Sequence, residues 1–209
     1  MFTCAYCGID ACEKDDPSKF PLNCPCLLKE EMEEVKKLYE EGDNKKLAHE
    51  AALTEAIGYC EKTRLEEIMD FAHRMGYEKI GIAHCIGLKK EARAFCDVLK
   101  HNGFKVETVA CKSGYIPKEF INISDFEKID PGTFETMCNP IGQAYLLDRE
   151  GTDLNVILGL CVGHDTLFMK YSKAPVTVLA TKDRVLAHNA MAALYLADGY
   201  YHDKLYGKK

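Results

Sequence analysis

The chain has 209 residues, 47% of them hydrophobic and 29% charged, which suits one folded domain with an appendage or two small domains. The 33 acidic residues outnumber the 27 basic ones, and the net charge of −6 argues against a nucleic-acid-binding surface. The longest apolar run, near residues 156–162, is far shorter than the roughly 20 residues that a membrane span needs. The N-terminus lacks the basic and apolar regions of a secretory signal. We therefore expect a soluble, cytoplasmic protein that binds neither nucleic acid nor a membrane.

Cysteine is the unusual feature of the composition, with 11 residues in a chain that contains no tryptophan. In a reducing compartment a disulfide framework is the poorer explanation for so many thiols, and an odd number does not suit a fully paired scaffold. Five of the cysteines fall within the first 26 residues. Metal binding or thiol chemistry is the function class that this composition favours.

Three segments follow one another in the chain. Residues 1–26 form a cysteine-rich module that is too short of apolar residues to build a core without a cross-link. Residues 27–75 have helical periodicity, which predicts a helix over 28–42 and a second helical stretch from 44 to 76 that is interrupted near Gly58. Residues 76–209 are expected to form an α/β domain.

In this third segment, apolar runs alternate with amphipathic stretches. The runs predict strands over residues 79–85, 105–111, 154–161 and 174–183, and the stretches between and after them predict helices over residues 88–103, 140–151, 164–173 and 186–199. This alternation predicts a small, doubly wound, Rossmann-like domain with a mainly parallel sheet of about four strands. The expected strand order is 2-1-3-4.

The N-terminal module has the pattern C-x2-C-x4-C-x11-C-x-C. Its first pair, Cys4 and Cys7, is followed by a glycine and is typical of a metal knuckle, in which two thiolates face one ion. Cys12 is the expected third ligand, Cys24 is the fourth because a proline follows it, and Cys26 is left over. Zn²⁺ is the first choice for such a site, and an iron–sulfur cluster is the alternative, because both use four thiolates.

A second group of cysteines lies at the carboxyl ends of the predicted strands. Cys85, Cys111 and Cys161 each end an apolar run, and Cys138 precedes an Asn-Pro helix start. Open parallel sheets bind ligands at this edge, so the four cysteines are expected to line a crevice that the connection 112–137 folds over. They could hold a second metal or cluster, act as reactive thiols, or be small buried residues.

The remaining candidates carry weaker signals. His164 could be a ligand, a proton donor or a helix cap, and His188 with Asp183 and Arg184 lies at the exit of the fourth predicted strand. We expect a structural role for His84. Cys60 and Cys96 are expected inside helices as small packed residues. No nucleotide-binding, hydrolase or zinc-protease motif occurs in the chain.

Several phrases of the sequence, CAYCG, NCPC, GIAHCIGL, MCNPIGQA and GLCVGHD, together resemble one family over essentially the whole chain. This is an uncharacterised metal-binding family of anaerobic archaea and bacteria, domain of unknown function 1847. The resemblance implies metal binding by the N-terminal cysteines. It implies no activity and no catalytic residue.

Three hypotheses follow. The first is a redox or iron–sulfur protein with an N-terminal site on Cys4, Cys7, Cys12 and Cys24 and a second cluster on the crevice cysteines. The second is an enzyme that uses a crevice cysteine of low pKa. The third is a binding or scaffold protein with a zinc staple. Small-molecule or redox partners, the substrate and the oligomeric state stay open.

Overall fold

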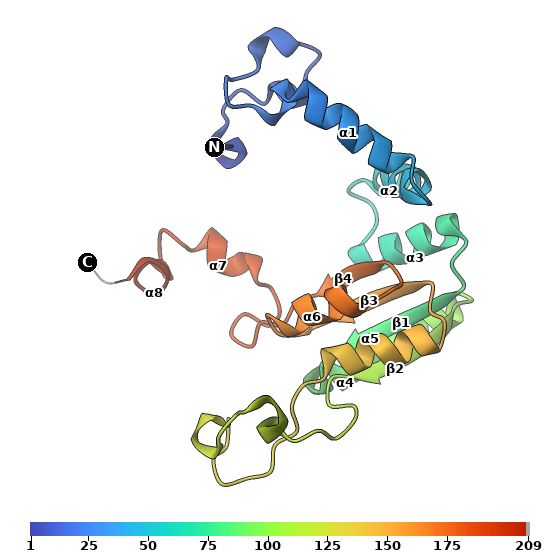
Figure 1. The fold of residues 1–209 in the computed structure, drawn as a ribbon, viewed down its shortest axis with the longest axis vertical. Coiled ribbons are helices and arrows are strands. Elements are labelled where there is room, and N and C mark those ends of the chain that lie inside the picture. Colours follow the sequence, from blue (N-terminus) through green and yellow to red (C-terminus); the bar gives the residue numbers. More distant parts are fainter. Residues whose placement is uncertain (208–209) are drawn as a thin grey trace. The chain divides into compact units, whose positions relative to one another are not determined.

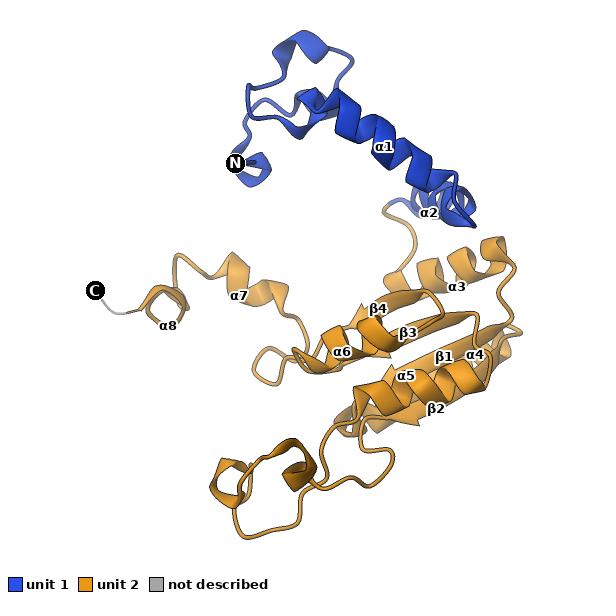
Figure 2. Ribbon diagram, in the orientation of Figure 1, with its two compact units in different colours: residues 1–59 blue, residues 60–209 orange. Residues whose placement is uncertain are grey.

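The computed structural model describes residues 1–207 of the chain, and it divides into two compact units, residues 1–59 and 60–209 (Figure 1, Figure 2). The first unit contains the cysteine module and two helices, and the second contains the sheet. The predicted boundaries after residues 26 and 75 stay a prediction.

The first unit has almost no buried side chains. Its helices are α1 (Lys29–Tyr39) and α2 (Asn44–Gly58), which pack against each other. Residues 1–28 contain four short 3-10 turns, Cys4–Tyr6, Ala11–Glu13, Pro17–Lys19 and Pro25–Leu27. Within these residues only Ala11 is buried, while Met1, Tyr6 and Leu22 are almost fully exposed. Burial of apolar surface therefore contributes little to the stability of this segment.

The second unit is built on a parallel sheet of four strands. They are β1 (Lys79–His84), β2 (Lys105–Ala110), β3 (Leu154–Leu158) and β4 (Val176–Ala180). The strand order is β2-β1-β3-β4 with every pair parallel, so the α/β class and the order 2-1-3-4 are both confirmed.

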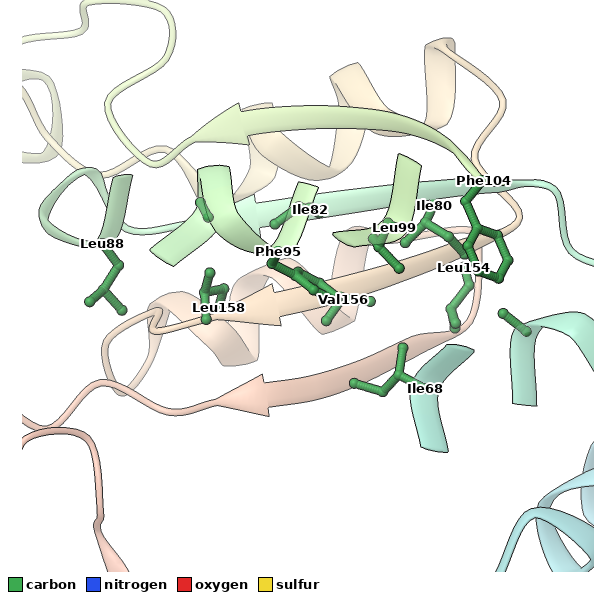
Figure 3. Close-up of a cluster of buried hydrophobic side chains, with 12 residues drawn as sticks. Ile68, Ile80, Ile82, Leu88, Phe95, Leu99, Phe104, Leu154, Val156 and Leu158 are labelled. Carbon is green, nitrogen blue, oxygen red and sulfur yellow. The ribbon is translucent and has the colours of Figure 1, made fainter. Parts of the chain in front are cut away.

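Helices cover both faces of this sheet, as a doubly wound fold requires. The first face packs against α3 (Arg64–Met75) and α4 (Lys89–His101), and the second against α5 (Pro140–Arg149) and α6 (His164–Tyr171). Figure 3 shows the first of these cores, in which Ile68, Phe95 and Leu99 of the helices meet Ile80 and Val156 of the strands. α3 begins at a capping box between Thr63 and Glu66, and it ends at Gly76, whose φ of 77° closes the helix.

Alternate strand residues supply the two cores. In β3, Val156 faces α3 and α4, whereas Asn155 and Ile157 face α5 and α6. Gly81 of β1 has no room for a side chain, because a Cβ there would lie 2.1 Å from Oδ1 of Asn155 and 3.1 Å from Leu147. Helix α5 therefore approaches the sheet closely at this point.

The structure corrects two details of the predicted helices. The helix expected over 186–199 is only α7 (Met191–Tyr195), followed by α8 (His202–Tyr206). Its start is delayed because the Asp183 carboxylate accepts bonds from the N–H groups of residues 185 and 186, and Ala187 and His188 have positive φ values. Cys60 lies between α2 and α3, is exposed and has a φ of 57°, so the prediction of a packed helical residue is wrong there.

Among the described residues, no helix has both the length and the apolar character of a membrane span.

Candidate functional site

A cavity of about 500 Å³ lies at the carboxyl ends of the strands in the second unit. All four cysteines predicted for the crevice line it: Cys85, Cys111, Cys138 and Cys161. The connection 112–137 supplies an apolar wall, which comprises Ile121, Ile123, Ile129 and Met137. The volume falls within the roughly 300–1,000 Å³ typical of small-molecule sites.

The strand order brings three of these cysteines to one edge. The hydrogen-bond ladder continues one residue beyond the strands, since the N–H of Cys85 donates to the Leu158 carbonyl at 3.1 Å and that of Cys111 donates to the His84 carbonyl at 2.9 Å. Cys161 follows the neighbouring β3. Adjacent strands lie about 4.8 Å apart, so residues just beyond their ends are close neighbours.

Cys138 reaches the same place through the start of α5. Oδ1 of Asn139 accepts a hydrogen bond from the N–H of Gly142 at 2.9 Å, and Pro140 occupies the first turn, as the sequence predicts. The N–H of Asn139 donates to the Cys111 carbonyl at 2.7 Å. This bond holds Cys138 beside Cys111.

Cys111 is the central member of the group of sulfur atoms. Its Sγ accepts a hydrogen bond from the N–H of Ile86 at 3.3 Å, and its side chain interacts with those of Cys138 and Cys85. The hydrogen bond with Cys111 lowers the pKa of Cys138 to about 6, with help from the charge of Lys112. The same bond, together with burial, raises the pKa of Cys111. The interaction therefore favours the protonated form of Cys111 and the thiolate form of Cys138.

Positive charge surrounds these thiols. Four cationic side chains line the cavity, and among its described lining residues Glu127 is the one carboxylate: the cations are Lys112, Lys118, Lys182 and Arg184. The Arg184 guanidinium donates to Sγ of Cys161 at 3.2 Å, and this contact raises the pKa of Arg184. Burial, and after it the charges of Lys112 and Arg184, lower the pKa of His164 and favour its neutral form.

The sequence analysis missed the three cavity lysines, Lys112, Lys118 and Lys182, and gave Arg184 little weight. Lys112 directly follows Cys111, and Lys182 and Arg184 lie two and four residues beyond β4; these positions near the strand ends were the signal available. The other two candidates near Arg184 serve the local backbone, because Nδ1 of His188 accepts from the N–H of Asp183 and the Asp183 carboxylate caps the next turn. His84 is buried, with Nδ1 3.0 Å from the Cys85 carbonyl oxygen. These interactions are structural.

The N-terminal cysteines lie around a second, smaller cavity within the first unit. All four predicted ligands line this cavity of about 280 Å³: Cys4, Cys7, Cys12 and Cys24. Cys26 is also near, since its side chain hydrogen-bonds to that of Cys24, and this bond raises the pKa of Cys26. Within residues 1–207, however, no three Cys, His, Asp or Glu side chains are grouped so that they could hold a metal ion as they stand. The donors are of the right kind, but their present spacing is not that of a formed site.

The comparisons with known proteins agree with one another. The model of a family described as "Protein of unknown function (DUF1847)" matches residues 24–179, which include the four crevice cysteines and leave out Cys4, Cys7 and Cys12. An uncharacterised protein of Methanocaldococcus jannaschii is 51% identical over 167 residues, covering 80% of this chain and 83% of that protein. No solved structure matches the chain. The chain therefore belongs to the DUF1847 family of proteins of unknown function.

Proposed function

We propose that this protein is a thiol-dependent redox protein, in which Cys138 and Cys111 act as a dithiol pair in the strand-end cavity. The observation that carries the proposal is that both cysteines line one cavity with cationic side chains, where the N–H of Asn139 donates to the Cys111 carbonyl at 2.7 Å and holds the two residues side by side. It favours the second of the three hypotheses, a reactive cysteine of low pKa, and keeps the redox character of the first.

The pair has the properties that thiol–disulfide exchange requires. Exchange needs a thiolate that attacks, and the Cys138 sulfur is ionised at neutral pH while remaining only half-buried. It also needs a second thiol within reach, and Cys111 is held there by the backbone bond to Asn139. The charge of Lys112 favours the thiolate form of Cys138.

The reaction would reduce a small organic disulfide in two steps. Cys138 attacks one sulfur of that disulfide, its S–S bond breaks, and one thiolate leaves with a proton from water. Cys111 then attacks Sγ of Cys138 in the mixed disulfide and releases the second thiolate, which takes the proton that Cys111 loses. Two electrons move from the protein to the small molecule, and a Cys111–Cys138 disulfide remains.

We also propose that the N-terminal module binds a metal through Cys4, Cys7, Cys12 and Cys24. The four side chains around one cavity and the near absence of buried residues support this role, because a metal would supply the cross-link that the segment lacks. Zn²⁺ is the first choice and an iron–sulfur cluster the alternative. When bound, either would tie the 3-10 turns together.

The test of the thiol chemistry is to titrate reduced, anaerobically purified full-length protein with hydroxyethyl disulfide and to map the products by peptide mass spectrometry. We expect one disulfide, between Cys111 and Cys138, and two equivalents of mercaptoethanol per chain. Cys138→Ser should abolish both, and Cys60→Ser, at an exposed position outside the cavity, should change neither. A different pairing would overturn the proposal. So would iron or zinc bound to the crevice cysteines of the purified protein, because ligation would occupy the same sulfurs.

A further inference from the structure

The cations that line the strand-end cavity differ in whether they have a partner within the protein. Lys118 is paired with Glu135, and Lys112 donates to the Thr136 carbonyl. Lys182 has no side-chain hydrogen bond or ion pair within the described residues. The residue as a whole is half-buried, and a bound anion would supply a partner for its ammonium group.

The position of Lys182 in the fold directs its side chain into the cavity. Its N–H donates to the Leu160 carbonyl at 3.1 Å, which fixes its backbone beside the end of β3. Its side chain passes two glycines. A Cβ at Gly159 would lie 4.0 Å from Cδ of Lys182, and a Cβ at Gly87 would lie 3.5 Å from its Nζ. A Cβ at Gly87 would also lie 3.8 Å from Sγ of Cys85, so Gly87 adjoins both the ammonium group and this sulfur.

Arg184 also lines the cavity and donates to Sγ of Cys161. The connection 112–137 contributes apolar side chains to the wall, together with Lys112 and Lys118. Glu127, the one carboxylate among the described lining residues, already accepts bonds from the N–H and hydroxyl groups of Ser124. The cavity thus combines cationic side chains, apolar side chains and four cysteines.

We propose that this cavity binds a small organic disulfide or thiol with an acidic group, which Lys182 and Arg184 contact while its sulfur faces Cys138. The inference rests on the proposed thiol chemistry and names the class of substrate that this chemistry acts on. Paired cations next to an apolar wall select an organic acid over a neutral molecule of the same size.

Two alkylating reagents of nearly equal size test this preference. The rates of Cys138 alkylation by anionic iodoacetate and neutral iodoacetamide are measured at pH 7 and low salt by peptide mass spectrometry, and each is divided by its rate with free mercaptoethanol. Both reagents need the same thiolate, so their normalised ratio cancels differences in thiolate reactivity. We expect the ratio to favour iodoacetate by about tenfold and to fall as salt is added.

Variants of Lys182 and Arg184 test whether these two cations cause the preference for iodoacetate. Lys182→Gln and Arg184→Gln should each lower the ratio several-fold, the double variant should bring it close to one, and Lys182→Arg should retain it. Lys100→Gln, in the last turn of α4 and outside the cavity, is the matched control and should leave it unchanged. A ratio near one in the unmodified protein, or an unchanged ratio in Lys182→Gln, would overturn the substrate class while leaving the thiol chemistry intact. Slow alkylation of Cys138 by both reagents would overturn the thiol chemistry and this inference with it.

Discussion

The side chain of Cys111 hydrogen-bonds to that of Cys138, and the N–H of Asn139 donates to the Cys111 carbonyl oxygen at 2.7 Å. These two contacts tie the end of the edge strand β2 to the start of α5. They make one sulfur a hydrogen-bond donor and the other an acceptor. The difference in pKa between the two thiols, and the proposed chemistry, follow from this asymmetry.

The pH dependence of Cys138 alkylation should reflect its lowered pKa. The Cys111 hydrogen bond favours the thiolate, so the rate should rise through a midpoint near pH 6 and reach a plateau by about pH 7. The groups that face Cys138 include Lys112, Cys85 and Cys161, and the charge of Lys112 acts in the same direction. The measurement is the iodoacetamide rate at this residue from pH 5 to 9. A midpoint between 8 and 9 would contradict the assigned thiolate.

Removing the donor should move this profile. In Cys111→Ala the thiolate of Cys138 loses its first stabilising interaction, and the midpoint should rise towards that of an ordinary thiol. Cys111→Ser keeps a hydrogen-bond donor and should shift the midpoint less. Comparing the two variants separates the hydrogen bond from simple packing of the side chain. Equal midpoints in both variants would show that the Cys111 hydrogen bond does not set the pKa.

Gly81→Ala should destabilise the second unit. The new Cβ would lie 2.1 Å from Oδ1 of Asn155, whose amide group is buried and bonded to Thr152 and Ser172 at 2.8 Å. Either α5 moves away or these bonds break, so we expect the free energy of unfolding to fall by about 1–3 kcal/mol. Urea unfolding followed by circular dichroism measures it. Gly199→Ala, where the nearest atom is 3.8 Å away, is the control and should have little effect.

Metal content should depend on the N-terminal cysteines. Cys4→Ser should lower the bound metal per chain and speed hydrogen exchange within residues 1–28, because few buried side chains hold this segment together. The measurements are metal analysis and hydrogen exchange on anaerobically purified protein. Cys60→Ser, which changes an exposed thiol outside the module, should leave both unchanged. Equal metal content in the two variants would contradict the proposed ligands.

The sheet and the position of the crevice could be predicted because both follow from local patterns. Apolar runs that alternate with amphipathic stretches gave the strand order, and the cysteines at the ends of those runs gave the cavity lining. The prediction of a long final helix was wrong because the carboxylate of Asp183 accepts hydrogen bonds from N–H groups at the expected start of that helix. The contact between Cys161 and Arg184 joins two different strand ends, and no spacing in the sequence encodes it.

The sequence could predict the direction of the pKa shift of Cys138 but not its main cause. A helix start next to a cysteine suggests a stabilised thiolate, but the main cause is the hydrogen bond from Cys111, which depends on how the connection 112–137 returns to the sheet. In the same way, the sequence places Lys182 near the end of a predicted strand, whereas the direction of its side chain depends on the space left by Gly159 and Gly87.

The most direct test of the account is a competition among all 11 cysteines of the reduced protein. The protein is treated at pH 7 with less than one equivalent of iodoacetamide, and peptide mass spectrometry determines which sulfur is modified first. Cys138 should carry most of the label, because it combines a pKa of about 6 with a half-buried position on the cavity wall. Label spread evenly over the exposed cysteines, or found first on another crevice cysteine, would contradict the account.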